Sequence, residues 1–242
     1  LGKTPLHIAH DKDNKALAAF LIRQGADPTE YRFPELKGDY FGQPLPGDRA
    51  VVFAPGIVSV EGLEHSPPVF SKDGNEMFWA SEFATYILHS KRINGRWSEP
   101  SKAVFNSGFG DGEPIFSTDN NRLFFLSLRS LDGTKKDERE RLWYVDRKDD
   151  SWSQAVCLGP QANQNPMHWT ISIDDQDSLY FTSTRGNGFG KHDIFRIRLK
   201  NGSYLAPENL GPRINTAATE TTPYIDPRRR YLICARIGHI EG

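Results

Sequence analysis

The chain has 242 residues, of which 30 are lysine or arginine and 31 are aspartate or glutamate, so its formal net charge is −1. This balance excludes a strongly basic polyanion binder, and we expect no nucleic-acid partner. With 37% hydrophobic and 12% aromatic residues, the chain is no disordered acidic tail. No apolar run reaches the roughly 18 residues of a membrane-spanning helix.

The first thirty residues predict two short helices. Residues 4–9 read Thr-Pro-Leu-His-Ile-Ala; Thr4 can cap a first helix that has proline in its first turn. Leu17, Phe20 and Leu21 recur at the spacing of one face of a second helix. Gly25 suits the left-handed residue that ends such a helix.

The motif at residues 4–9, the spacing and the helix stop together resemble an ankyrin repeat. The resemblance implies that residues 1–30 are the end of an array and that His7 makes structural hydrogen bonds. Because one repeat cannot bury its own face, we expect further repeats before Leu1 and a chain that is a fragment. A chance amphipathic helical hairpin is the alternative.

Residues 31–61 are rich in proline and glycine, a composition that opposes helices and central strands. This stretch is expected to be a linker. Only residues 50–54, Ala-Val-Val-Phe-Ala, predict a strand, which would lead into the region that follows.

Residues 62–242 contain a unit that recurs about every 50 residues, the period of a β-propeller blade. The copies begin at Pro68, Pro114, Thr170 and Pro223. Each begins with a short apolar run and a turn, and then continues with a β-branched and aromatic run. Turns such as Asp73-Gly74 tolerate positive φ, so each copy predicts a hairpin.

A third strand is expected in each complete copy, over residues 86–91, 142–146 and 193–199. Trp97, Trp152 and Tyr204 would then open a fourth strand. The predicted fold is mainly β: a partial β-propeller with three complete four-stranded antiparallel blades and a partial fourth, preceded by one α-helical ankyrin repeat. We expect residues 50–54 to complete an absent last blade.

The Phe70-Ser71-Lys72-Asp73-Gly74 turn, the Trp97-Ser98-Glu99-Pro100 motif and the Asp193-Ile194-Phe195 strand resemble the TolB-type, WD-like propeller repeats of bacterial proteins. The resemblance covers about residues 33–236 and implies a propeller, with no single activity. It slightly favours a periplasmic or exported location. Ankyrin arrays favour the cytoplasm, so the compartment stays open.

Charged and aromatic residues gather where the first strand of each copy starts and the second ends. Antiparallel pairing brings these ends together. We therefore predict a binding site at one mouth of the propeller channel, for a polar ligand or for a charged loop of a protein or peptide partner. Inter-blade ion pairing is the alternative. The residues are Glu64, His65, Asp111, Glu113, Arg129, His168, Trp169, Arg185 and Glu220.

Other patterns favour structural roles. The glycine-rich residues 185–192 lack the spacing of a phosphate-binding loop and predict a loop between the second and third strands. Residues 174–177 are expected to be a solvated turn rather than a calcium site, and the mixed-charge residues 135–141 a solvated loop. Cys157 and Cys234 lie in apolar stretches, which favours small buried side chains; a single bridge between them is the alternative.

The sequence favours a non-catalytic binding or scaffold protein that needs no cofactor or metal. One alternative is a hydrolase acting on a glycan or a peptide at the propeller mouth. Its mark would be a close carboxylate pair, for which Asp111 and Glu113 are the candidates. Another alternative is an accessory propeller of an enzyme.

Overall fold

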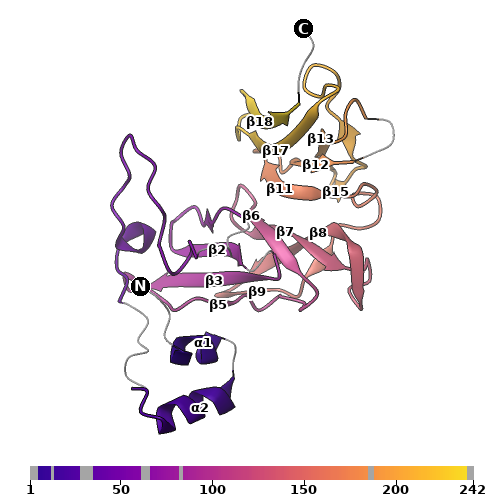
Figure 1. Ribbon diagram of the computed structural model, residues 1–242. Helices are drawn as coiled ribbons and strands as arrows, with labels where there is room; N and C mark the ends of the chain where they lie inside the picture. Colours follow the sequence, from indigo (N-terminus) through magenta and orange to yellow (C-terminus); the bar gives the residue numbers. More distant parts are fainter. Residues whose placement is uncertain are drawn as a thin grey trace. The chain divides into compact units, whose positions relative to one another are not determined.

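A computed structural model describes residues 5–11, 14–27, 35–60, 66–81, 84–184 and 188–238 (Figure 1). The protein is mainly β, with two short helices near its N-terminus. It divides into two compact units. One comprises Leu1–Glu61 with Arg92–Glu99, and the other Gly62–Lys91 with Pro100–Gly242.

The two predicted helices form: α1 is Pro5–Asp11 and α2 is Lys15–Arg23. Leu6, Ala9 and Ala18 make the buried core between them, and Leu21 packs on it. Leu17 and Phe20, expected on the same face as Leu21, stay 39% and 49% exposed. The small Ala18 occupies the contact instead. Thr4 and the His7 side chain lie outside the described residues.

The end of α2 follows the predicted glycine stop. Gly25 has φ +93°, the left-handed conformation that glycine adopts without steric cost. The Gly25 amide donates to the Ile22 carbonyl at 3.0 Å, and the Ala26 amide donates to the Leu21 carbonyl at 3.0 Å. These two bonds satisfy the last carbonyls of the helix in a Schellman motif.

The described residues of the second part of the chain form two five-stranded antiparallel sheets, one four-stranded sheet and two two-stranded sheets. We group their strands into blades 1 to 4 and describe the short hairpins that extend the third strands below. Blade 1 comprises β1 (Val69–Phe70), β2 (Glu76–Ser81), β3 (Tyr86–Ile93) and β5 (Ser101–Lys102). Blade 2 comprises β6 (Asp111–Phe116), β7 (Arg122–Arg129), β8 (Lys136–Lys148) and β10 (Val156–Cys157). Blade 3 comprises β11 (His168–Ile173), β12 (Leu179–Ser183), β13 (Asp193–Ile197) and β16 (Glu208–Asn209), and blade 4 comprises β17 (Thr219–Ile225) and β18 (Leu232–Ile237).

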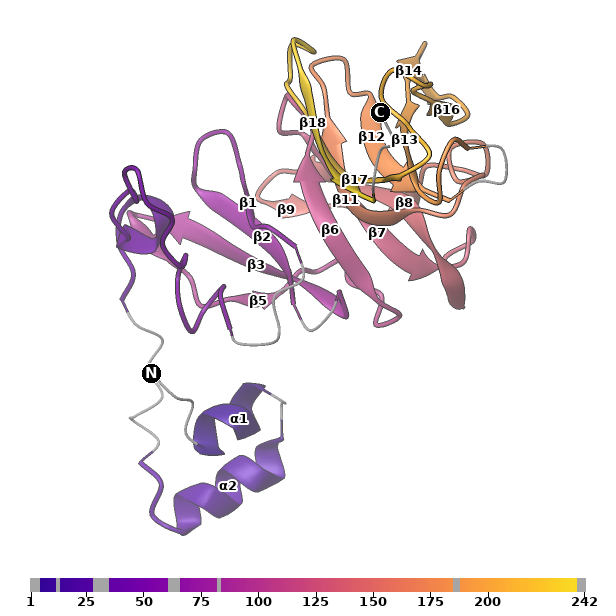
Figure 2. The same cartoon turned by 45° about the horizontal axis from the view of Figure 1, so that its top comes forward.

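The first strands of consecutive blades lie next to one another. β6 packs against β1 and β2, β11 against β6, and β17 against β11 (Figure 2). Sheets that are arranged around adjacent first strands make a partial β-propeller, as predicted.

A short hairpin, here called the arm, extends the third strand of blades 1 to 3. The arms contain β4 (Arg96–Trp97), β9 (Ser151–Trp152), and β14 (Leu199–Lys200) with β15 (Ser203–Tyr204). Trp97 and Trp152 pair with the third strand of their own blade, and the chain pairs with that same strand again at β5 and β10. These aromatic residues therefore begin the return along the third strand, as predicted, and the pairing is interrupted before β5 and β10. Tyr204 returns in the same way, opposite Leu199. Turn residues with positive φ, such as Asn94 and Gly95, make the tight reversal that precedes the aromatic residue.

The mixed-charge stretch before Leu142 is also strand rather than the expected loop. β8 begins at Lys136 and pairs with β7, with Ser127 opposite Arg141 and Arg129 opposite Lys136. The exposed end of a strand can contain charged side chains, because the hydrogen bonds to the neighbouring strand are made by backbone groups.

Residues 35–60 have no strand at the expected residues 50–54. The Gln43 side chain donates to the Val52 carbonyl at 2.9 Å and accepts the Ala54 amide at 2.8 Å. These backbone groups therefore bond to a side chain instead of a neighbouring strand. A short turn, η1 (Asp39–Gly42), lies in this stretch, and Tyr40 and Phe41 within it have positive φ values of +50° and +58°.

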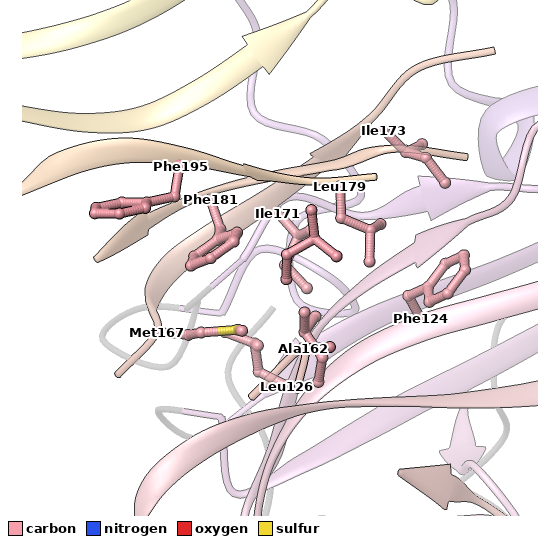
Figure 3. Close-up of a cluster of buried hydrophobic side chains, with 11 residues drawn as sticks. Phe124, Leu126, Ala162, Met167, Ile171, Ile173, Leu179, Phe181 and Phe195 are labelled. Atoms are coloured by element: carbon pink, nitrogen blue, oxygen red, sulfur yellow. The ribbon is translucent and has the colours of Figure 1, made fainter. Parts of the chain in front are cut away.

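The largest side chains are buried between blades. Phe124 and Leu126 of β7 pack with Leu179 and Phe181 of β12, and Figure 3 shows these side chains facing one another. A second cluster joins blade 1 to blade 2. Blade 1 contributes Phe78 of β2 to it. Cys157 and Cys234 are free thiols, each half-buried.

Candidate functional site

The predicted mouth is described in part. Glu64, His65 and Arg185 lie outside the described residues, as do the side chains of His168 and Trp169. Asp111, Glu113, Arg129 and Glu220 are described, and all four are buried.

Asp111, at the start of β6, is enclosed by donors of its own blade. Its carboxylate accepts the Ser107 amide and hydroxyl at 2.7 and 2.8 Å, and the Ser127 hydroxyl at 2.7 Å. Arg129 Nη2 lies 3.1 Å from the same carboxylate. The Arg129 guanidinium also lies over the rings of Phe125 and Trp143, so the pair fastens the loop before β6 to the end of β7.

Glu220 of β17 repeats this arrangement in blade 4. It accepts the Thr216 hydroxyl at 2.6 Å and amide at 3.1 Å, and Arg236 Nε at 2.9 Å. In both blades the hydroxyl residue stands four positions before the acid, and the arginine lies at the end of the second strand. We call this arrangement the acid–arginine clamp.

Each clamp joins strands of a single blade. Inter-blade ion pairing, the alternative to a binding site at the predicted mouth, is therefore not what these two clamps make. An inter-blade pair does exist away from these clamps: Arg147 Nη2 of blade 2 lies 2.8 Å from Glu76 Oε2 of blade 1. Burial by itself raises the pKa of Glu76. Hydrogen bonds from His89, Trp152 and Arg147 outweigh burial and lower the pKa to about 2.

Three asparagines that the sequence analysis missed form a second repeated contact. Asn106, Asn163 and Asn215 each accept the amide and bond the carbonyl of one residue on the third strand of the preceding blade. These residues are Ile87, Leu142 and Ile194. A repeated spacing in the sequence could have revealed these asparagines. Each stands five residues before Asp111, His168 or Glu220.

A β-bulge interrupts the first strand of blades 2, 3 and 4. The register with the second strand shifts between Gly112 and Ile115, between His168 and Ile171, and between Thr221 and Tyr224. Glu113 and Thr222 have φ +52° and +48°, a conformation that costs side chains of this kind about 1–3 kcal/mol. Such bulges re-aim side chains and are common beside binding and active sites.

Glu113 is the charged residue of the bulges. Its side chain is buried, and burial raises its pKa to about 8, with a further contribution from the negative charge of Glu140 on β8. Burial raises the pKa of Glu140 to about 7. The Asp111 oxygens are occupied by the clamp, and the carboxylate charge that acts on Glu113 is that of Glu140.

The glycine-rich stretch is a structural loop over its described part, residues 188–192, which lies between β12 and β13 as expected. A Cβ on Gly190 would lie 1.7 Å from the Ala218 carbonyl oxygen, so only glycine permits this approach. The turn at residues 174–177 is not fully solvated: Asp174 is buried and accepts the Gln176 and Ser178 amides at 2.9 Å.

A polar cleft of about 220 Å³ lies away from the bulges, at the turn between β6 and β7. Its lining includes Ser117, Asp119, Asn121, Arg122, Asp146 and Asp177. Arg122 Nε lies 2.7 Å from Asp146 Oδ1, so this arginine is already paired. Over the described part of the chain, no three potential metal ligands come together.

No protein-family model matches the chain, and no curated protein matches it. Among solved structures, it is similar to TolB from Acinetobacter baumannii, with 16% identity, 73% of this chain and 38% of that chain covered, and a TM-score of 0.47. It is also similar to the β-propeller domain of Cps50 (Swd1) from Myceliophteria thermophila, with 10% identity, 72% and 48% covered, and a TM-score of 0.43.

A puromycin-hydrolyzing peptidase of Mycobacterium tuberculosis has 11% identity, with 72% of this chain and 30% of that chain covered and a TM-score of 0.46. The chain spans between a third and a half of the length of the solved structures that head the comparison. Likeness at this level carries no argument about function. Among the described residues, no helix is long and apolar enough to cross a membrane.

Proposed function

We propose that the chain is a non-catalytic binding module that takes a protein or peptide partner at the bulge end of its blades. The observation that carries this proposal is that hydrogen bonds repeated from blade to blade, here called the frame, hold one bulge residue, here called the tip, whose identity differs between blades 2 and 4. The frame is the acid–arginine clamp of blades 2 and 4 together with the asparagine contacts. The tip is the residue two positions after the first-strand residues 111, 168 and 220. It is Glu113 in blade 2, Thr170 in blade 3 and Thr222 in blade 4.

This division suits recognition because a rigid frame can present different side chains to a partner. Thr222 is exposed at this position and would contact the partner directly. Glu113 is buried, and its raised pKa of about 8 keeps its carboxyl protonated near neutral pH, so it would hold the shape of the tip beneath the partner. Glu64, His65, His168, Trp169 and Arg185 belong to the same proposed surface by their place in the sequence.

The helical hairpin supplies a second surface. We interpret it as an ankyrin repeat and the blades as TolB-type repeats, on the motifs given above. Ile8, Leu17, Phe20 and Ile22 are exposed apolar side chains on α1 and α2. Exposed apolar groups on a helical repeat favour a neighbouring repeat or a protein partner.

Affinity capture with the full chain, followed by cross-linking and mass spectrometry, tests the proposal. We expect a partner that wild type retains and Glu113→Ala loses. Phe20→Glu tests the helical surface, and Val104→Glu is the control because Val104 is 73% exposed on another loop. A partner lost only with Phe20→Glu would move the site to the helices. A partner retained by all variants would contradict both surfaces.

A hydrolase acting on a glycan or peptide is the second candidate, and the Glu113–Glu140 pair favours it. Carboxyls with pKa values of about 8 and about 7 can hold or release a proton near neutral pH, as acid–base catalysis requires. Turnover of a glycan or peptide by wild type, abolished in both Glu113→Gln and Glu140→Gln, would replace the binding proposal with this one.

A further inference from the structure

Blade 2 contains three buried hydrogen-bond donors for which the described residues supply no acceptor. They are Arg129 Nε, Arg141 Nε and Trp143 Nε1. The three residues are only 5%, 5% and 4% exposed. A buried donor without a partner costs free energy, so such groups are rare in native proteins. Three of them together point to an acceptor that the described residues do not provide.

The three donors belong to one face of blade 2. Arg141 and Trp143 are two residues apart on β8, a spacing at which side chains point to the same face of a strand. Arg141 lies opposite Ser127 of β7, and Trp143 lies opposite Phe125. The Arg129 guanidinium lies 5.1 Å from the centre of a Trp143 ring. We call Arg129, Arg141 and Trp143 the donor cluster.

The acids that pair with the donor cluster bond other atoms of the two arginines. Arg129 Nη2 donates to Asp111 Oδ1 at 3.1 Å and also to the Phe105 carbonyl. Arg141 Nη2 pairs with Asp137. Burial lowers the pKa of Arg129, although Asp111 acts in the opposite direction. One carboxylate thus compensates the buried guanidinium only in part, and a further anion would compensate it better.

The donor cluster lies at the bulge end of blade 2, where we place the partner. Arg129 is the last residue of β7, and residues 130–135 connect it to β8. Gly133 in this connection has φ +74° and lies against the indole, because a Cβ there would come within 3.1 Å of Trp143 Cη2. Leu131 beside it is 41% exposed. A group from solvent would therefore approach the cluster beside this connection.

We propose that the donor cluster is a carboxylate-binding subsite for an acidic side chain or the C-terminus of the peptide partner. The inference rests on the proposed function, since it names the chemistry of a group recognised at the same end of the blade. Guanidinium and indole N–H groups only donate, so the ligand atom must be an acceptor. Hydrogen bonds from a guanidinium to a carboxylate are the stronger, charge-assisted kind. A carboxylate is also small and flat, as a buried subsite requires.

Titration of sodium acetate into the full chain, with isotope-labelled tryptophan side chains, tests the subsite by nuclear magnetic resonance. We expect the Trp143 indole N–H signal to shift with a saturable dependence on acetate, because its proton gains an acceptor. The Trp152 signal should stay in place, since Trp152 Nε1 already donates to Glu76 at 3.1 Å. Trp143→Phe identifies the signal by removing it. Acetamide, a neutral molecule of similar shape, should have little effect.

Arg141→Lys keeps the positive charge and removes Nε. The affinity for acetate should fall about tenfold, as expected for the loss of one hydrogen bond to a charged group. Arg139→Lys, at an exposed position of the same strand, is the matched control and should keep the affinity. A Trp143 signal that acetate leaves in place, or that moves in parallel with the Trp152 signal, would overturn the subsite. Buried water would then satisfy the donors. Equal affinity in wild type and Arg141→Lys would overturn it as well.

Capture of the partner separates this inference from the proposed function. We expect Trp143→Phe to lose the partner as Glu113→Ala does, and excess acetate to release it from wild type. Partner peptides with an amidated C-terminus, or with amides in place of acidic side chains, show which carboxylate binds. A partner lost by Glu113→Ala but retained by Trp143→Phe would overturn the subsite and leave the proposed function standing. Saturable acetate binding with a partner that all variants retain would support the subsite and contradict the proposed function.

Discussion

Blades 2 and 4 begin alike and differ in what surrounds them. Both have an acid–arginine clamp, a bulge two residues later and an antiparallel hairpin. In blade 2, Phe124 and Phe125 are fully buried between neighbouring blades, whereas Ile233 of blade 4 is exposed. The comparison separates what a hairpin does locally from what only neighbouring sheets provide.

The largest expected difference between the two blades concerns their apolar positions. Phe124→Ala should lower the free energy of unfolding by about 3–5 kcal/mol, because it opens a cavity in a packed cluster. Ile233→Ala should cost less than about 1 kcal/mol, since an exposed side chain leaves no cavity. Urea denaturation of both variants measures this. Equal losses would mean that the blade 4 face is covered in solution.

The second-largest expected difference is the loss of stability when the clamp of each blade is broken. Asp111→Ala removes one partner of a buried pair and strands the Arg129 charge, which costs about 3–5 kcal/mol. Arg236→Ala should cost only about 1–2 kcal/mol, because the Arg236 side chain is partly exposed and Glu220 keeps its two bonds from Thr216. Thermal unfolding of the two variants compares them, and a larger loss for Arg236→Ala would contradict the ranking.

The stability of blade 2 should depend on pH in a way that blade 4 does not share. Blade 2 has Glu113 at the bulge position that Thr222 occupies in blade 4. Glu113 and Glu140 have folded-state pKa values of about 8 and about 7, above the ordinary 4.5. The folded state therefore binds more protons, so stability falls as pH rises from about 4.5 through about 8. The slope is at most about 1.4 kcal/mol per pH unit for each group.

Urea unfolding at several pH values measures this slope. Glu113→Gln should flatten it, because the variant side chain does not titrate. Glu138→Gln, on an exposed position of the same strand β8, is the matched control and should keep the slope. A Glu113→Gln variant with the wild-type slope would contradict the assignment.

The smallest expected effect concerns the bulge of blade 4. Thr222 has φ +48°, which glycine adopts without the clash of a β-branched side chain. Thr222→Gly should therefore stabilise blade 4 by about 0.5–1 kcal/mol. Slower hydrogen exchange at the Thr221 amide would confirm this, and faster exchange would show that the side chain is needed there.

Much of the fold could be predicted from the sequence because its signals are local. Turn residues between β-branched runs placed the hairpins, and Gly25 placed the end of α2. The strand predicted at residues 50–54 failed because Gln43, several residues away, bonds the backbone there. The loop predicted before Leu142 failed because pairing with β7 extends β8 through charged residues.

The candidate site was harder to predict. The sequence placed Asp111 and Arg129 at one end of a blade but not their mutual pairing, which depends on the register of β6 and β7. Glu140 was missed because nothing in a mixed-charge run shows which carboxyl will be partly buried. The asparagine contacts were missed although their spacing repeats, because a single asparagine is an ordinary loop residue.

The period of the blades, the places of the turns and the two helices follow from local sequence signals, since they depend on backbone preferences and on alternation of side chains over a few residues. Which charges pair inside the protein and which aromatic residues are covered depends on the packing of the blades. Both outcomes depend on strands from different repeats coming together, and burial and electrostatic pairing are properties of that assembly.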